Sequence, residues 1–186
     1  MRILITGVLV GVVAIVAAVV WRSQSVEPRP TVSDEAGVLT IAVLADDVTV
    51  KESSVADFKK IDKEARVGEG AEIKTSATGR ASILYPSGTI ANLIGDTHTV
   101  VKNLNFDGRQ SKLRLMVGGI RSKLKNILNV GDFYQVETEN MVASVRGTEF
   151  GVNFTNGISV IEVFENKVEV QAVDPKTGQP IEGGFV

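Results

Sequence analysis

The sequence predicts an all-β fold: a compact, antiparallel, multi-stranded domain, arranged as a sandwich or a short β-solenoid-like stack, behind one N-terminal transmembrane helix. Three observations predict it. Only 5% of the 186 residues are aromatic while 18 are glycine, and Val, Ile and Thr are abundant, which favours strands and turns over helices. After residue 36, short alternating runs are separated by Gly, Asn, Asp and Pro, as in antiparallel β domains. The chain also starts with one long apolar run.

The apolar run covers residues 3–21 and contains no charged residue. As a helix it would cross the hydrocarbon layer of about 30 Å, with Trp21 and Arg22 at the interface. A cleaved signal peptide is the alternative, but its apolar core is usually only about 7 to 15 residues long. We expect an uncleaved signal anchor over 1–22, a polar linker over 23–35 and the β domain over 36–186.

The orientation of the anchor follows from charge. Arg2 and the α-amino group favour a cytoplasmic N-terminus, although Arg22 and Arg29 follow the span. Since only two residues precede the span, we expect the β domain to lie outside the cytoplasm, in the periplasm or at the cell surface.

In the first half of the domain, the alternating pattern predicts six strands, over 38–44, 48–51, 72–75, 81–85, 89–94 and 97–102. Residues 54–62 fit either a helical turn or a short strand. Pro86-Ser87-Gly88 forms the turn that follows Tyr85.

A hairpin is predicted at Gly118-Gly119, with the facing pairs Val117–Ile120, Leu115–Ser122 and Leu113–Leu124. The other face of this hairpin would carry Lys112 opposite Lys125 and Arg114 opposite Lys123, and like charges that face each other are destabilising. A corner between stacked sheets at the two glycines is the alternative that avoids this cost.

The end of the chain predicts a three-stranded meander. With Asn156-Gly157 as a two-residue turn, the facing pairs are Thr155–Ile158, Phe154–Ser159, Val152–Ile161 and Phe150–Val163. With Glu165-Asn166 as the next turn, the facing pairs are Val163–Val168, Ile161–Val170 and Ser159–Ala172. Partners across a pair share a face. One dry interior is therefore expected for Phe150, Val152, Ile161, Val163, Val168 and Val170, with Glu162 opposite Glu169 on the outer face.

The residue types argue against catalysis. The chain has no Cys, which excludes disulfides, thiolate nucleophiles and Cys-based zinc sites. His98, the single His, has only Asp96 as a nearby second ligand, so a partly exposed strand histidine is expected rather than a metal site. Ser87 and Ser144 have no base except His98, and no G-x-S-x-G motif or phosphate-binding loop occurs. We expect no catalytic, cofactor-binding or metal-binding residues.

Charge is segregated along the domain. Residues 101–130 contain seven Lys or Arg and one Asp, whereas residues 131–186 contain three basic and nine acidic residues. A candidate partner-binding patch is formed by Lys112, Arg114, Arg121, Lys123 and Lys125, which suits acidic lipid headgroups, an anionic envelope polymer or a protein carboxylate surface. Internal pairing with an acidic face carrying Glu149, Glu162 and Glu169 is the alternative. Nucleic acid is disfavoured because the strip has no stacking aromatic residues.

Three motifs carry a resemblance to a known family. They are G-D-x-x-x-V-E-T at 131–138, A-S-V-R-G-T-E-F-x-V at 143–152 and I-S-V-I-E-V-F-E-N-K-V-E-V at 158–170. Together with V-G-E-G-A-E-I-K-T and G-R-A-S-I-L-Y-P-S-G-T upstream, they resemble the FecR domain over roughly residues 67–173. The best-known members are single-span sensors of bacterial iron uptake: an outer-membrane transporter contacts the periplasmic part, and a cytoplasmic N-terminal segment controls a sigma factor.

The most specific part of the resemblance is the motif Arg146, Gly147, Thr148 and Phe150. Within an apolar strand, Gly147 permits a bulge or a close backbone approach. Arg146 and Thr148 can then donate to carbonyls left unpaired, as a structural staple, while anion binding by Arg146 is the functional alternative.

Two functions are expected. The first is a membrane-anchored, extracytoplasmic, non-enzymatic FecR-like binding or scaffold module that contacts a protein or an anionic envelope polymer. The second is a component of iron-type transmembrane signalling that lacks a cytoplasmic output segment, because only Met1 and Arg2 precede the span.

Overall fold

The computed structural model describes residues 37–125 and 128–185. The predicted anchor over 1–22 and the linker over 23–35 lie outside these residues. Within the described part, fifteen strands and no helix are formed, so the all-β prediction is confirmed. None of the described residues belongs to a helix long and apolar enough to span a bilayer.

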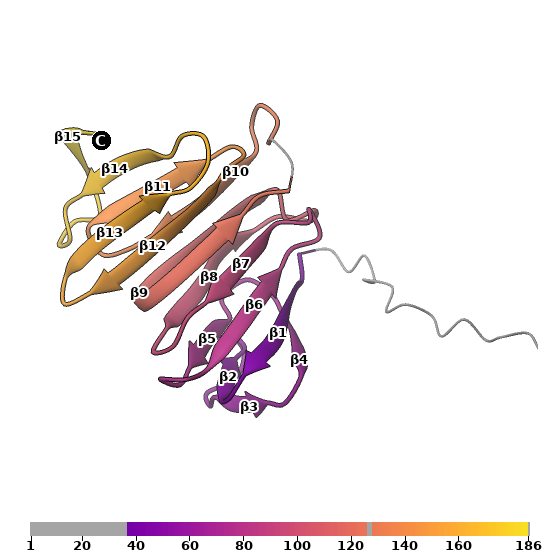
Figure 1. Cartoon of the computed structure of the whole chain (residues 1–186). Helices are drawn as coiled ribbons and strands as arrows, with labels where there is room; N and C mark the ends of the chain where they lie inside the picture. Colours follow the sequence, from indigo (N-terminus) through magenta and orange to yellow (C-terminus); the bar gives the residue numbers. More distant parts are fainter. Residues whose placement is uncertain (1–36, 126–127, 186) are drawn as a thin grey trace, which may run out of the picture. The chain divides into compact units, whose positions relative to one another are not determined.

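The strands form two facing sheets (Figure 1). Sheet A has the strand order β4-β1-β6-β7-β9-β12-β13, and sheet B has the order β3-β2-β5-β8-β9-β10-β11-β14-β15. Sheet A contains β1 (Leu39–Ala45), β4 (Glu64–Val67), β6 (Arg80–Leu84), β7 (Ile90–Leu93), β12 (Glu149–Thr155) and β13 (Ile158–Val163). Sheet B contains β2 (Val48–Lys51), β3 (Lys59–Ile61), β5 (Glu72–Thr75), β8 (His98–Leu104), β10 (Phe133–Glu137), β11 (Met141–Val145), β14 (Glu169–Val173) and β15 (Pro180–Phe185).

β9 (Gln110–Lys123) belongs to both sheets. Its first half pairs with β8 and β10 in sheet B, and its second half pairs with β7 and β12 in sheet A. The chain changes sheet at Gly118 and Gly119, so the predicted hairpin is wrong and the corner is correct. Gly118 has φ 92°, and a Cβ there would lie under 3 Å from atoms of Thr97 and Asp96. Only glycine allows this close approach.

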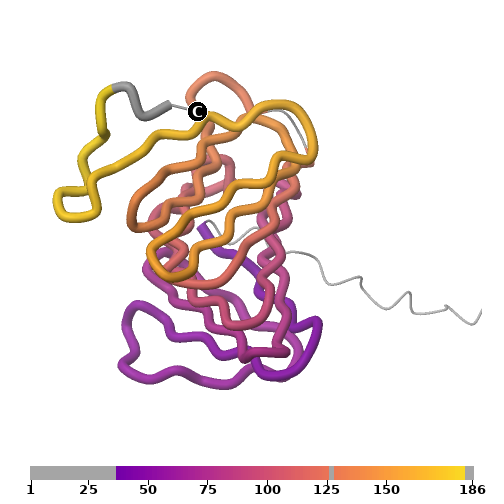
Figure 2. Tube along the Cα trace, turned by 60° about the vertical axis from the view of Figure 1, so that its left-hand side comes forward, coloured from indigo at the N-terminus to yellow at the C-terminus, as the bar shows by residue number. Residues whose placement is uncertain are grey.

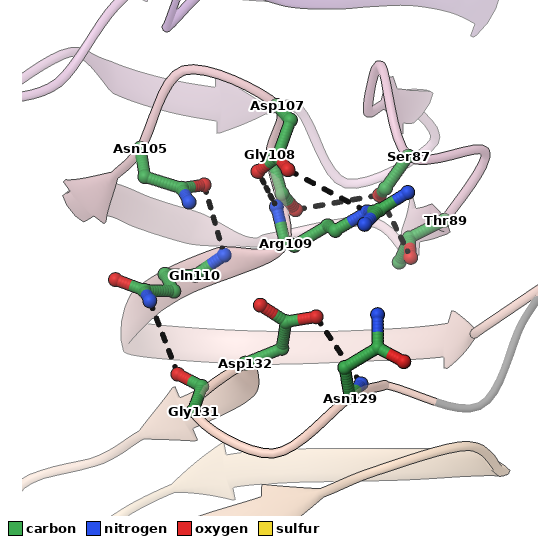
Figure 3. A network of polar contacts seen from close by, with 10 residues as sticks. All are labelled: Ser87, Thr89, Asn105, Asp107, Gly108, Arg109, Gln110, Asn129, Gly131 and Asp132. Carbon is green, nitrogen blue, oxygen red and sulfur yellow. Dashed lines mark hydrogen bonds and ion pairs between the residues drawn. The ribbon is translucent and has the colours of Figure 1, made fainter.

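One ladder is parallel, contrary to the fully antiparallel expectation. Strand β10 runs parallel to β9 with Phe133 opposite Gln110. Two hydrogen bonds explain the direction, and Figure 3 shows the first of them, between Gln110 and Gly131. The Gln110 side-chain amide donates to the Gly131 carbonyl at 3.1 Å, and the Phe133 N–H donates to the Arg109 carbonyl at 3.1 Å. The loop before β10 is thereby held beside the start of β9, so both strands begin at the same end.

The core lies between the sheets and draws apolar side chains from both. Leu39, Ile41 and Ile83 of sheet A and Ile73, Leu113 and Val136 of sheet B are fully buried. Tyr134 contacts Tyr85 and Phe150 edge to face, with ring centroids 5.6 and 6.1 Å apart, a geometry that aromatic pairs prefer. Burial raises the pKa of Tyr134 to about 12.

The predicted strands of the first half are confirmed, and residues 59–61 of the ambiguous segment form a strand. β4 is an additional strand that the sequence reading missed. The Asn156-Gly157 hairpin has the predicted register, from Thr155 opposite Ile158 to Phe150 opposite Val163.

The second half of the predicted meander is wrong. Strand β14 does not pair with β13 but with β11, with Ala143 opposite Val170. Glu162 and Glu169 therefore lie on different sheets. Val168 and Val170 still pack against the shared core from sheet B, whereas Val163 is 49% exposed rather than interior.

Candidate functional site

The family-type motif around Gly147 carries the chain from sheet B to sheet A, between β11 and β12. The Gly147 carbonyl accepts a hydrogen bond from the Asn166 side-chain amide at 2.8 Å. Thr148 is 2% exposed, and its hydroxyl donates to the Glu165 carbonyl. The Glu149 carbonyl accepts the N–H groups of Phe164 and Glu165 at 2.9 and 3.2 Å.

Residues 147–149 and 164–166, here called the motif joint, are therefore bonded to each other by four hydrogen bonds. Both segments belong to the sequence motifs that carry the family resemblance. Because the bonds capture the chain directly after β13, they explain why residues 164–168 cross to sheet B instead of forming the predicted hairpin. Buried backbone groups need such partners.

The four residues of the predicted staple occupy different environments. Phe150 is fully buried and Thr148 is nearly so. Gly147 has φ 153°. Arg146 is exposed, and no hydrogen bond or ion pair of its side chain to another described residue occurs. Donation to the carbonyls of the crossing thus comes from Thr148 and Asn166 rather than from Arg146.

Glu149 links the motif joint to β9. Its carboxylate accepts hydrogen bonds from Arg121 Nε at 2.8 Å and Lys123 Nζ at 2.8 Å. The Arg121 guanidinium also lies 4.0 Å from the centroid of the Phe164 ring, a favourable cation–π geometry. The Lys123 ammonium, followed by the Arg121 guanidinium, holds the pKa of the Glu149 carboxyl below its usual value. We call Arg121, Lys123, Glu149 and Phe164 the Glu149 cluster.

The five cations of the predicted patch do not share one face. Arg121 and Lys123 lie on the outer face of sheet A beside Glu149. Lys112 and Arg114 lie on sheet B, where each is 3.6 Å from Glu137. Lys125 is exposed just after β9. The split follows from the corner at Gly118, which sends the two halves of β9 into different sheets.

A groove of about 560 Å³ crosses the outer face of sheet B. Lys112, Arg114 and Glu137 line one part of it, and the β14–β15 loop with Lys176 lines the other. It mixes cations and carboxylates, so it has no single charge preference. Sequence reasoning missed this groove, because the loop folds over β10 and β11 only once β14 has joined sheet B.

The single histidine takes part in a surface cluster. His98 Nε2 lies 2.8 Å from the Glu72 carboxylate, which also pairs with Lys51 at 2.5 Å. Lys51, followed by smaller contributions that include His98, lowers the pKa of Glu72. Asp96 is not part of this cluster, and within residues 37–125 and 128–185 no group of three or more metal-type ligands occurs.

The Glu149 cluster contains one residue that sequence reasoning did not select, Phe164, whereas Glu149 was already named as an internal partner for the basic strip. Phe164 and Glu149 belong to the quoted motifs, but their proximity depends on the motif joint. Only the register of β9 against β12 could have predicted this proximity, because it places Lys123 opposite Glu149 and Arg121 opposite Gly151.

Comparison with known proteins places the chain, by its sequence, in a family. A search of curated proteins returns no match. Two crystal structures of a candidate anti-sigma factor from Parabacteroides distasonis, at 1.65 and 2.50 Å resolution, are each 17% identical with a TM-score of 0.46. Each match covers 59% of this chain and 57% of the other. The family model described as FecR protein matches residues 71–169, more than half of the chain. These residues include β5 to β13 and the whole motif joint, and the chain belongs to the FecR family.

Proposed function

We propose that this FecR domain is a non-enzymatic binding module on the extracytoplasmic side of a membrane, anchored by its N-terminal apolar run, and that it acts by contact with another protein or an envelope polymer. The observation that carries the proposal is the motif joint. The Thr148 hydroxyl and the Asn166 side-chain amide donate to backbone carbonyls of this joint, so these two motif residues stabilise the fold rather than presenting reactive groups.

A second candidate is a role in transmembrane signalling, supported by membership of the FecR family. Both candidate functions require a partner. They differ in whether binding of the partner changes gene transcription. Measuring transcription of genes that respond to the partner, with and without the chain, separates them.

The location is tested with cysteine labelling, because the chain contains no Cys. Arg146→Cys places a single thiol at an exposed position, and Phe150→Cys places one in the core. A membrane-impermeant maleimide is expected to label Arg146→Cys in intact cells and Phe150→Cys only after denaturation. Labelling of Arg146→Cys only after permeabilisation would contradict the extracytoplasmic location.

The binding role is tested by photocrosslinking in intact cells from outward-facing positions on both sheets, such as the half-buried Lys112 and the exposed Arg121. We expect one defined adduct from at least one sheet. Charge reversal of Arg121 and Lys123, with reversal of Lys112 and Arg114 as the matched control on the other sheet, then reports which face is used. Absence of an adduct from every exposed position would contradict the binding function.

A further inference from the structure

Strand β13 forms one edge of sheet A and has a free side. Among the described strands it pairs only with β12. It is six residues long, with the sequence ISVIEV, and Ile158, Val160 and Val163 are 64, 50 and 49% exposed. A long edge strand rich in β-branched residues is a template for another strand.

The unpaired backbone groups on this edge can be assigned. In a two-residue hairpin the residues flanking the turn, Thr155 and Ile158, form a hydrogen-bonded pair, and such pairs then alternate. The Phe164 N–H bond to the Glu149 carbonyl fits the same alternation. Ile158, Val160 and Glu162 therefore bond to β12. The N–H and C=O groups of Ser159, Ile161 and Val163 point to the free side.

The other sheet edges carry features that discourage pairing. β3 has three residues, two of them exposed lysines. β4 has four residues and includes Glu64 and Arg66, and β15 begins with Pro180. Short, charged or proline-containing edges are the usual protection against strand addition. Only the β13 edge, among the strands described, combines length with apolar character.

Both ends of β13 are fixed. At its start, the Ser159 hydroxyl donates to the Asn140 side-chain carbonyl at 2.6 Å and lies 2.7 Å from the Thr138 hydroxyl. At its end, the motif joint holds Phe164 and Glu165. An edge that is already ordered has little conformational entropy to lose when a strand binds.

Sheet B extends beyond sheet A next to this edge. After the shared β9, sheet A adds β12 and β13, whereas sheet B adds β10, β11, β14 and β15. Figure 2 shows the last strands, in yellow, projecting beyond the rest of the domain. Val170 and Ala172 of β14 are half-buried and share a face with the buried Ala143 and Met141. A strand added to β13 would cover this apolar shelf.

The charge near β13 indicates which kind of partner strand it would bind. Glu162 lies on β13 and Glu165 follows it in the motif joint, whereas Glu169 lies on β14 in sheet B. Neither Glu162 nor Glu165 forms an ion pair with another described residue. A second copy would bring two such acidic edges together, which is unfavourable. A basic segment of a different protein neutralises them.

We propose that β13 binds an extended segment of a partner protein by strand addition, with apolar side chains toward Ile161 and Val163 and Lys or Arg opposite Glu162. The proposal rests on the proposed binding function and specifies its partner class.

The probe is a fluorescein-labelled peptide, Lys-Ile-Lys-Val-Val-Thr-Val-Lys, designed to run antiparallel to β13. Its second residue faces Val163 and its third faces Glu162. Binding to the full-length chain in detergent micelles is followed by fluorescence anisotropy. No saturable binding up to about 1 mM peptide, which corresponds to a free energy near −4 kcal/mol, would overturn the proposal.

The decisive variant is Val163→Pro, which removes one N–H on the free side while leaving the bonds to β12 in place. Val163→Thr is the matched control, because it keeps the N–H and the β-branched shape. We expect Val163→Pro to weaken peptide binding about tenfold or more, with Val163→Thr within about twofold of the parent chain. Glu162→Lys should weaken binding about fivefold and reduce its salt dependence. Equal binding by Val163→Pro and Val163→Thr, with thermal unfolding showing that both fold, would overturn the proposal.

Crosslinking in cells separates this proposal from the function on which it rests. A partner adduct that forms in the parent chain and in Val163→Thr but is lost in Val163→Pro supports strand addition. An adduct retained in Val163→Pro overturns strand addition while the binding function stands. Concentration-dependent dimerisation that Val163→Pro abolishes would assign the edge to a second copy and overturn the proposed partner class.

Discussion

Two of the places where the chain crosses between the sheets differ in character: Gly118-Gly119 within β9 and residues 146–148 before β12. Each crossing uses a buried threonine hydroxyl. Thr97 accepts from the Gly119 N–H at 3.0 Å and donates to its carbonyl at 3.2 Å, while Thr148 donates to the Glu165 carbonyl. The β9 crossing is enclosed by close contact with Thr97, whereas the second crossing is flanked by the exposed Arg146 and the charged Glu149 cluster.

The difference shows that a buried threonine hydroxyl can stabilise two kinds of crossing. The enclosed crossing depends on space and contains no ionisable side chain. The exposed crossing depends on hydrogen bonds between two motif segments and on an ion cluster that responds to pH. Substitutions at the two crossings should therefore differ in size and in pH dependence.

The largest effect is expected for Gly118→Ala. The added Cβ meets Thr97 and Asp96 at under 3 Å, and φ 92° strains any side chain. The free energy of unfolding should fall by about 3 kcal/mol or more. Gly157→Ala is the matched control, because it also has positive φ but no atom within 4 Å, and should cost only about 1 kcal/mol. Urea unfolding measures both, and equal losses would contradict close packing at the β9 crossing.

The next effect compares the two hydroxyls. Thr97→Val removes both a donor and an acceptor for buried Gly119 and should cost about 2 to 3 kcal/mol, whereas Thr148→Val removes one donor and should cost about 1 kcal/mol. The two variants are compared by urea unfolding at neutral pH. A larger loss for Thr148→Val would mean that the motif joint, rather than the β9 corner, is the more tightly coupled crossing.

The pH dependence should distinguish the crossings further. Because the folded-state pKa of Glu149 lies below its usual value of 4.5, its charged form stabilises the fold above that pH, and this contribution is lost as the pH falls through the folded pKa. Glu149→Gln should therefore be less stable than the parent chain at pH 7 and converge with it under acid conditions. The cost of Thr97→Val should not change over the same range. Unfolding curves between neutral and acid pH test this, with Glu162→Gln as the control carboxylate, and a constant deficit for Glu149→Gln would contradict it.

The smallest effect is expected for Arg146→Ala. The side chain is exposed, so the free energy of unfolding should change by less than about 0.5 kcal/mol. If Arg146 acted as the staple of the crossing, the loss would approach that of a charged hydrogen bond, about 2 kcal/mol. Thermal unfolding with Arg146→Lys as the control separates these outcomes.

Much of the fold could be predicted from two-residue alternation. The Asn156-Gly157 hairpin has its predicted register because the turn chemistry and the apolar pattern agree. Alternation also indicates that Val168 and Val170 face a core. It does not say from which sheet they do so, because in a sandwich both sheets face the same interior. The pairing of β14 with β11 was therefore missed.

The candidate site was less predictable for a related reason. The cations in and directly after β9 were predicted as one partner-binding patch, although like charges in the predicted hairpin already argued against a shared face. The corner at Gly118 separates Lys112 and Arg114 from Arg121 and Lys123, and each pair then finds its own carboxylate, Glu137 or Glu149. The internal-pairing alternative already named Glu149, whereas Glu137 was missed because it reaches Lys112 and Arg114 only through the parallel pairing of β10 with β9.

The membership of β9 in both sheets has a kinetic consequence. It pairs with strands that precede it, β7 and β8, and with strands that follow it, β10 and β12. The early and late strands of each sheet are therefore joined only after β9 has paired with both. Assembly must therefore wait for contacts between distant segments, which puts the domain among slow-folding β proteins. Amides in the middle of β9 should exchange with solvent last, and the rate-limiting barrier should respond most to substitutions along that one strand.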